Sequence, residues 1–270
     1  MNTVISQDGT TIAYDRSGDG PALILVGGAF QYRAFDPRTG QLAELLAPHF
    51  TVYHYDRRGR GDSGDIAPYA VEREIEDLAA LVEAAGGSAY LFGMSSGAPL
   101  ALDAVAHGLP ITKLVVYEAP FIVDDSRPPV HEDYLARLTE FVSTGHRGDA
   151  VTLFLTEAVG VPAEYVAPMR DTPVWAGFEA VAHTLPYDGA IMDGTLSGKA
   201  LPAQRWASVK IPTLVADGGA SGPAMHSAAQ ALADLLPDAR RRTLDGQEHA
   251  VDPVILAPVL MDFFINQLAG

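Results

Sequence analysis

The sequence predicts an α/β fold, in which helices cover both faces of a mostly parallel sheet. Short apolar runs alternate with segments of helical periodicity between Ala22 and Tyr117. The run from Ala22 to Val26 is apolar throughout, which is typical of a strand buried on both faces. Polar or glycine-rich residues follow several of these runs, and in such sheets small molecules bind beyond the carboxyl ends of the strands.

The first 120 residues supply most of the predicted elements. The Asp8-Gly9 pair between two predicted strands is a strong signal for a hairpin turn. The other strands are short apolar runs, and the helices repeat apolar residues about every 3.6 positions. The predicted strands are Thr3 to Ser6, Thr10 to Arg16, Ala22 to Val26, Thr51 to Tyr55, Ala89 to Phe92 and Lys113 to Tyr117. The predicted helices are Gln41 to Leu46, Val71 to Ala85 and Ala98 to His107.

The pattern changes from residue 121 to about residue 206, where no strand is convincing. Helical periods occur at Tyr134 to Val142 and at Val151 to Ala158. Prolines at positions 162, 168, 173 and 186 break the pattern that follows. We therefore expect a mostly helical insertion over the strand ends.

After this insertion the sheet resumes. The predicted elements are a strand from Ile211 to Ala216, a helix from Met225 to Leu235, a strand from Arg240 to Leu244 and a helix from Pro253 to Leu268. This organisation predicts a core domain made of residues 1–120 and 207–270, with residues 121–206 inserted into it.

Composition and charge exclude several classes of protein. The chain has 270 residues, of which 48% are hydrophobic and 19% are charged, as expected of a globular protein with a large core. No apolar run approaches the ~20 residues that span a bilayer, and the N-terminus lacks the basic and apolar blocks of a secretory signal. The formal net charge of −16 repels nucleic acid and anionic membranes, so we expect neither as a partner.

The chain contains no cysteine. Disulfides, thiolate metal sites and a cysteine nucleophile are therefore excluded, and a cytoplasmic location fits this composition. We expect no metal and no cofactor. The oligomeric state stays open, with a homodimer as one option.

Residues 93–97 have the sequence Gly-Met-Ser-Ser-Gly and connect a predicted strand with a predicted helix. In this context the Gly-x-Ser-x-Gly pattern forms a tight turn that presents the serine oxygen above the sheet. Ser95 is therefore the candidate nucleophile. The N–H of Ser96 opens the helix and points at the same place, where it can stabilise developing negative charge.

Two other segments with glycines follow predicted strands. Gly27 and Gly28 let the backbone approach a ligand closely. Residues 56–64, with the sequence Asp-Arg-Arg-Gly-Arg-Gly-Asp-Ser-Gly, look too charged for a core and too rich in glycine for a helix or strand. Their three arginines are a candidate anion site, but we expect Asp56 and the arginines to brace the loop through salt bridges.

A serine hydroxyl is a weak nucleophile and needs a neighbouring base. His249 is the best candidate, because it lies in a loop between the last predicted strand and the final helix. It also follows the serine in chain order, as this arrangement requires. The other histidines lie within predicted elements, at their ends or in the insertion.

Together these features resemble the α/β-hydrolase superfamily over nearly the whole chain. The resemblance rests on residues 27–29, 56–63, 93–97 and 249. It implies an eight-stranded sheet with a helical cap, residues 121–206, inserted after the sixth strand. It also implies that Ser95 attacks a carbonyl, that His249 transfers the proton, and that the N–H groups of Ala29 and Ser96 hold the oxyanion.

Two positions depart from the family pattern. Many relatives have His-Gly where this chain has Gly27-Gly28, a change that keeps the backbone donor. The family usually places an aspartate four residues after Asp217, where this chain has Ser221. A serine cannot stabilise an imidazolium as a carboxylate does, so another residue must supply the acid.

Several residues can take the role of the missing acid. We favour Glu118 at the end of the sixth strand, from which some members of the family supply the acid, although it could instead be a structural carboxylate tied to loop N–H groups. Asp217, at the end of the seventh strand, is the alternative. Asp252 is a weaker candidate, because we expect it to cap the last helix ahead of Pro253. A Ser-His dyad without an acid is the remaining option.

These features favour a cofactor-free serine hydrolase that cleaves an ester, thioester or lactone through an acyl-enzyme. The predicted substrate contacts are Gly28, Phe30, Met94 and Trp175, and the aromatic residues of the insertion favour a small molecule with an apolar group. Two alternatives stay open: a protein of this fold that binds a small ligand without turnover, and a hydrolase of C–C bonds. A serine rather than an aspartate at position 95 disfavours epoxide hydrolase and haloalkane dehalogenase chemistry.

Overall fold

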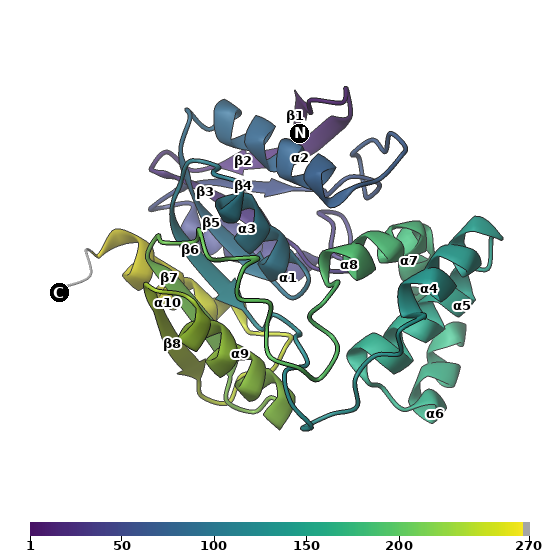
Figure 1. The fold of residues 1–270 in the computed structure, drawn as a ribbon. Helices are drawn as coiled ribbons and strands as arrows, with labels where there is room; N and C mark the ends of the chain where they lie inside the picture. The colour runs from purple at the N-terminus through teal and green to yellow at the C-terminus, as the bar shows by residue number, and fades with distance from the viewer. Residues whose placement is uncertain (267–270) are drawn as a thin grey trace.

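An eight-stranded sheet forms the centre of the protein in a computed structural model that describes residues 1–266 (Figure 1). The strands lie in the order β1-β2-β4-β3-β5-β6-β7-β8. The pairs β1 with β2 and β2 with β4 are antiparallel, and all the other pairs are parallel. The prediction of a mostly parallel eight-stranded sheet is therefore confirmed.

The strand bounds lie within two residues of the predicted ranges. The strands are β1 (Asn2–Ile5), β2 (Thr11–Ser17), β3 (Ala22–Val26), β4 (Thr51–Tyr55), β5 (Ala89–Met94), β6 (Ile111–Tyr117), β7 (Thr213–Gly218) and β8 (Ala239–Leu244). The strand β3 is recognisable because both of its faces are buried, which leaves an uninterrupted apolar run in the sequence. The strand β4 is also buried, although it contains Thr51 and His54.

Helices cover both faces of the sheet, and each face has its own hydrophobic core. The helices α1 (Pro37–Leu46) and α10 (Pro253–Ile265) pack together on one face. The helices α2 (Val71–Ala84), α3 (Gly97–Ala106) and α9 (Pro223–Leu235) cover the other face. Within the described residues the last helix ends at Ile265, and its predicted end at residue 268 lies outside them.

The helices between β6 and β7 form a separate layer at one side of the sheet (Figure 1). They are α4 (Tyr134–Ser143), α5 (Arg147–Leu153), the π-helix η1 (Phe154–Val159), α6 (Ala163–Val166), the 3₁₀ turn η2 (Ala167–Asp171), α7 (Pro173–Val181), the 3₁₀ turn η3 (Ala182–Thr184) and α8 (Leu185–Ile191). Most of their buried apolar residues form one cluster that also includes Phe30 after β3. The segment that leads from α8 back to β7 packs instead against the hydrophobic core of the sheet, where the ring of Trp206 contacts that of Phe121. The helices α4 to α8 are called the cap below, and the extent of the insertion, residues 121–206, stays a prediction.

The prolines of the cap start helices. Pro162 precedes α6, Pro173 is the first residue of α7, and Pro186 lies in the first turn of α8. Proline fits the first helical turn because the N–H that it lacks has no partner there in any case. These prolines therefore divide the region into short helices, and each lies at or near the start of the next helix.

The arginine-rich segment after β4 lies inside the protein, against the expectation from its charge. Its three arginine residues are each at most 2% exposed. Arg58, for example, binds the carboxylates of Asp77 and Asp8. The arginines do form salt bridges, but their partners come from outside the loop, and Asp56 binds Arg33 instead.

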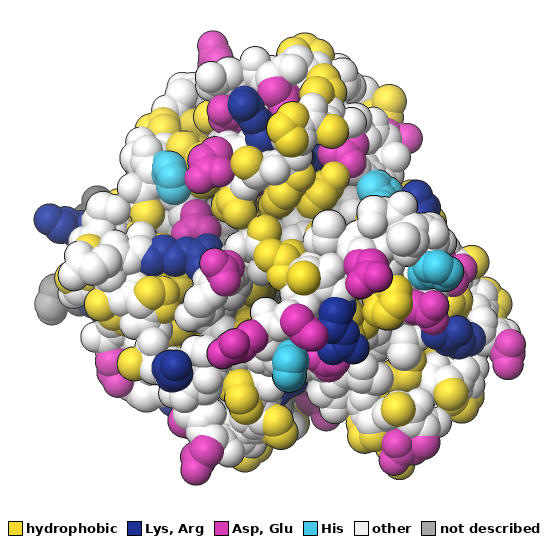
Figure 2. Space-filling model, turned by 45° about the vertical axis from the view of Figure 1, so that its right-hand side comes forward, with side chains coloured by type: hydrophobic (Ala, Val, Ile, Leu, Met, Phe, Trp, Pro, Cys, Tyr) yellow, Lys and Arg dark blue, Asp and Glu magenta, His cyan; other side chains and the backbone are white. Residues whose placement is uncertain are grey.

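The acidic side chains do not form a single patch on the face of the molecule that Figure 2 shows. Figure 2 shows them scattered over one face of the molecule, with Lys and Arg between them. The charge of the chain therefore does not by itself mark a binding surface on this face. Within residues 1–266, no helix combines the length and the apolar character needed to cross a membrane.

We predict that Arg58→Ala lowers the free energy of unfolding by about 3–5 kcal/mol, because it leaves the carboxylate of Asp77 buried without its partner. Arg73→Ala is the control: it removes a partly exposed ion pair with Glu76 and should cost less than about 1 kcal/mol. Urea unfolding followed by circular dichroism measures both losses. Equal losses in the two variants would contradict the prediction.

Candidate active site

Ser95 lies in the tight turn between β5 and α3. Its backbone φ is 55°, a left-handed conformation that is strained for a residue with a side chain. Its N–H donates to the carbonyl of Tyr117 on β6 at 3.0 Å. The turn brings α3 so close to the sheet that a Cβ at Gly97 would overlap the carbonyl oxygen of Val26. The structure therefore contains the strand, tight turn and helix that the sequence predicts here.

The backbone after β3 approaches Ser95 closely. A Cβ at Gly28 would lie 2.6 Å from the Cβ of Ser95 and 3.1 Å from its Oγ, so only glycine fits. Among the hydrogen bonds of residues 1–266, none uses the N–H of Ala29 or of Ser96. Both donors are therefore free to bind a ligand oxygen beside Ser95.

His249 and Glu118 meet beyond the end of β6. The Nδ1 atom of His249 lies 2.8 Å from Oε2 of Glu118. The side chain of Glu118 has no exposed surface. Its Oε1 atom accepts the N–H of Gly218 at 2.8 Å and the hydroxyl of Ser221 at 2.5 Å. Both oxygens of the buried carboxylate therefore have partners, as a charge removed from water requires.

Ser221 is the residue at which the chain departs from the family pattern. Its hydroxyl donates to the carboxylate of Glu118, so the serine and the carboxylate act as one hydrogen-bonded unit. The serine that replaces the usual aspartate is therefore in direct contact with the candidate acid, Glu118. This pairing gives a physical role to a serine where the family usually has an aspartate.

The surroundings of Glu118 keep its side chain charged. Burial raises its pKa, but hydrogen bonds from His249, Ser221 and Gly218 outweigh the burial and leave the pKa below the ordinary value of 4.5. At neutral pH the imidazole of His249 therefore lies against a carboxylate. Such a carboxylate can hold the Nδ1–H and stabilise an imidazolium.

The alternative acids are bound elsewhere. Arg241 donates two hydrogen bonds to the carboxylate of Asp217, at 2.9 and 3.0 Å, and Nδ1 of His226 lies 2.6 Å from it. Asp252 accepts the N–H of Val254 and caps α10, as predicted. Of the three candidate carboxylates, only Glu118 contacts His249.

Two cavities meet at Ser95. The larger has a volume of about 600 Å³ and lies between the strand ends and the cap. The smaller has a volume of about 210 Å³ and lies beside α1 and α10. Ala29, Ser95, His249 and Ala250 line both of them. The hydroxyl and the imidazole therefore border the same space, and a ligand there can extend in two directions.

The predicted substrate contacts have different outcomes. Phe30 lines the larger cavity and Met94 the smaller, whereas Gly28 lies against Ser95 and lines neither. The prediction for Trp175 is wrong. This residue is buried within the cap, where the guanidinium of Arg170 lies 5.4 Å from its ring centroid, and it lines neither cavity. Aromatic residues at helical spacing pack in a helical core as readily as they line a pocket, so sequence could not separate the two roles.

Sequence reasoning missed several residues of the larger cavity. Tyr134 and Phe154 contribute aromatic walls from the first part of the cap. Asp188 on α8 also lines this cavity, and it accepts the hydroxyl hydrogen of Ser96 at 2.7 Å. No motif marks Asp188, and its only signal is a carboxylate inside an otherwise apolar segment. Within residues 1–266, no three His, Asp or Glu side chains cluster in a way that would hold a metal ion.

The fold agrees with comparisons to known proteins. The model of the alpha/beta hydrolase family matches residues 22–258, and the chain belongs to that family. The solved structure of an alpha/beta hydrolase from Sphaerobacter thermophilus is 60% identical, with a TM-score of 0.89 over 97% of this chain and 100% of that one.

Two more distant proteins are also similar. The uncharacterized hydrolase YraK of Bacillus subtilis is 30% identical over 161 residues, so this chain matches only 56% of the length of that relative. The enol-lactonase from Burkholderia xenovorans is 22% identical, with a TM-score of 0.67 over 98% of this chain and 100% of that one. At this identity the likeness is one of fold.

We predict that Glu118 stabilises the folded protein at neutral pH and loses this effect in acid. A carboxyl group whose pKa is lowered on folding contributes stability above its unfolded pKa, near 4.5, and the contribution disappears as the pH falls through the folded pKa. Urea unfolding of the wild type and of Glu118→Gln, at neutral pH and at about pH 3, measures the difference. The wild type should be the more stable at neutral pH, and the gap should shrink in acid. A gap that widens in acid would disprove this.

Proposed function

We propose that this protein is a cofactor-free serine hydrolase that cleaves a small-molecule ester, thioester or lactone through an acyl-enzyme. One observation carries the proposal: His249 contacts the charged Glu118 at 2.8 Å and lines the two cavities that Ser95 also lines. A nucleophile, a base and an acid that orients the base are the three parts that this chemistry needs.

In the proposed reaction, Oγ of Ser95 attacks the substrate carbonyl while Nε2 of His249 takes the hydroxyl proton. Glu118 holds the Nδ1–H and stabilises the imidazolium. The N–H groups of Ala29 and Ser96 bind the oxyanion. The imidazolium then protonates the leaving alcohol or thiol. Water attacks the acyl-enzyme by the same route, which releases the acid and regenerates Ser95.

The two cavities support a small substrate with an apolar group. The wall of the larger cavity includes Phe30, Tyr134, Phe154 and Leu155. Burial of an apolar group against these side chains contributes binding energy, and the nearby polar groups orient the carbonyl. Cavities of this size fit a small molecule, and the proposal therefore names neither nucleic acid nor membrane as a partner.

Ser95→Ala should abolish hydrolysis of a short-chain p-nitrophenyl ester, with turnover reduced at least about 10⁴-fold, because the acyl-enzyme cannot form. Ser143→Ala removes an exposed hydroxyl of the cap and should leave the rate unchanged. The wild type should also react with a fluorophosphonate at Ser95, which mass spectrometry of the labelled peptide detects.

Each other outcome of this experiment has a definite meaning. Equal ester rates in the wild type and Ser95→Ala would refute the serine mechanism. A wild type that neither turns over nor becomes labelled would favour a binding protein of the same fold. A labelled enzyme that fails on esters and thioesters but releases product from a diketone would favour hydrolysis of C–C bonds.

Glu118→Gln should lower kcat by about 10²–10⁴-fold, because an amide cannot stabilise the imidazolium as a carboxylate does. Asp217→Asn should leave kcat within about fivefold of the wild type, because Asp217 contacts Arg241 and His226 but not His249. Steady-state kinetics at a temperature where both variants remain folded measures the two effects. The reverse order would transfer the role of the acid to Asp217.

A further inference from the structure

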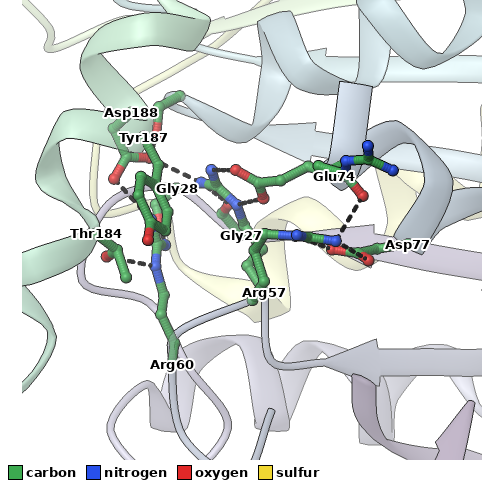
Figure 3. Close-up of polar contacts among 12 residues, drawn as sticks. Gly27, Gly28, Arg57, Arg60, Glu74, Asp77, Thr184, Tyr187 and Asp188 are labelled. Carbon is green, nitrogen blue, oxygen red and sulfur yellow. Dashed lines mark hydrogen bonds and ion pairs between the residues drawn. The ribbon is translucent and has the colours of Figure 1, made fainter. Parts of the chain in front are cut away.

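A cluster of two arginine and two acidic side chains lies buried between the core and the cap (Figure 3). Arg57 binds Glu74 through two hydrogen bonds, both at 2.7 Å, and its third nitrogen binds Asp188 at 2.8 Å. Arg60 binds the other oxygen of Asp188 at 2.6 Å. All four side chains are at most 2% exposed. Two positive charges therefore balance two negative charges in a region that is almost entirely buried.

The arginines also hold the backbone that approaches Ser95. The Nη1 atom of Arg60 donates to the carbonyl of Gly28 at 2.5 Å, and Nη1 of Arg57 donates to that of Gly27 at 3.3 Å. The carbonyl of Gly28 and the N–H of Ala29 belong to one planar peptide group. A hydrogen bond that holds this carbonyl therefore also sets the direction of the N–H on the opposite side.

Asp188 reaches the second backbone donor as well. Its Oδ1 atom accepts the hydroxyl of Ser96 at 2.7 Å, and its Oδ2 atom binds Arg60. Ser96 is the N-cap of α3, so its position fixes the start of that helix and the direction of its own N–H. The carboxylate of Asp188 thus binds Arg60, which holds the peptide group of the Ala29 N–H, and the side chain of Ser96, which carries the second free N–H.

We propose that Asp188 is a positioning residue that orients the N–H groups of Ala29 and Ser96 toward the oxyanion. Because Asp188 belongs to α8, the geometry of the catalytic site then depends on the packing of the cap against the core. This inference rests on the proposed hydrolase function. Asp188 acts through Arg60 and the hydroxyl of Ser96 and does not itself touch the reacting atoms.

The charge of Asp188 is required by its neighbours. Burial raises its pKa, but Arg60 and Arg57 outweigh the burial and lower it below the ordinary value, so the group stays ionised. An asparagine in its place keeps the shape but leaves two buried guanidinium groups with one carboxylate, Glu74. The guanidinium of Arg60 also donates to the hydroxyl of Thr184, which precedes α8. Residues of the cap therefore position the guanidinium that donates to the carbonyl of Gly28.

The test is Asp188→Asn in the full-length protein, assayed with the p-nitrophenyl ester. The kcat should fall about 10²–10³-fold, the size of the loss when one oxyanion donor is removed. The KM should change less than about threefold, because ground-state binding does not use the oxyanion contacts. Affinity for a trifluoromethyl ketone, which forms a tetrahedral adduct at a serine, should weaken by a similar factor to kcat.

Asp103→Asn is the matched control. Asp103 is a buried carboxylate on α3 that binds Arg205 at 2.6 Å and Trp206 at 2.8 Å, outside both cavities. This variant should lose stability in urea but keep its kcat within about threefold. In addition, Asp188→Asn and Ser96→Ala should lose less activity together than the product of their separate losses, because they break one shared contact.

The outcomes separate this inference from the proposed function. If Asp188→Asn leaves kcat unchanged, raises only KM, or loses no more kcat than Asp103→Asn does at a comparable loss of stability, then Asp188 is structural and the inference is wrong. If the wild type neither hydrolyses the ester nor reacts with the fluorophosphonate, the hydrolase function fails, and this inference fails with it.

Discussion

The carboxylate of Glu118 is removed from water, and a charge in that position is stable only if its oxygens are paired. Its partners are the N–H of Gly218, the hydroxyl of Ser221 and the imidazole of His249. Glu118 follows β6, whereas its partners follow or end β7 and β8. Pairing of this one carboxylate therefore fixes how three neighbouring strand ends meet. The position of His249 beside the cavities that Ser95 lines follows from the same constraint.

Buried charge also joins the cap to the core. A buried ion pair is tolerated only while its partners keep their geometry, since a lone charge in the interior is strongly unfavourable. The cap cannot move away from the sheet without separating Asp188 from Arg57 and Arg60. The same arginines hold the carbonyls of Gly27 and Gly28, so the docking of the cap and the backbone geometry next to Ser95 are physically linked.

Much of the fold could be predicted from local patterns, because strands buried on both faces leave apolar runs such as residues 22–26. The burial of the arginine segment after β4 was mispredicted, because it depends on contacts that are not local in the sequence. Asp77 is 19 residues away from Arg58, and Asp188 is 128 residues away from Arg60. No local pattern shows that these carboxylates neutralise the arginines. Trp175 was misplaced because side-chain type alone does not tell a core aromatic residue from one that lines a cavity.

The sequence by itself determined the candidate nucleophile and base, because a tight strand–helix turn requires small residues at fixed spacing around Ser95, and His249 follows in the expected chain order. It did not determine the acid, since Glu118 and Asp217 both lie at the ends of apolar strands. Only the tertiary structure shows which of these two carboxylates contacts His249. The backbone of Glu118 turns out of β6 at a φ of 46° and brings its side chain to His249, whereas Asp217 stays within β7, where Arg241 on the neighbouring strand binds it.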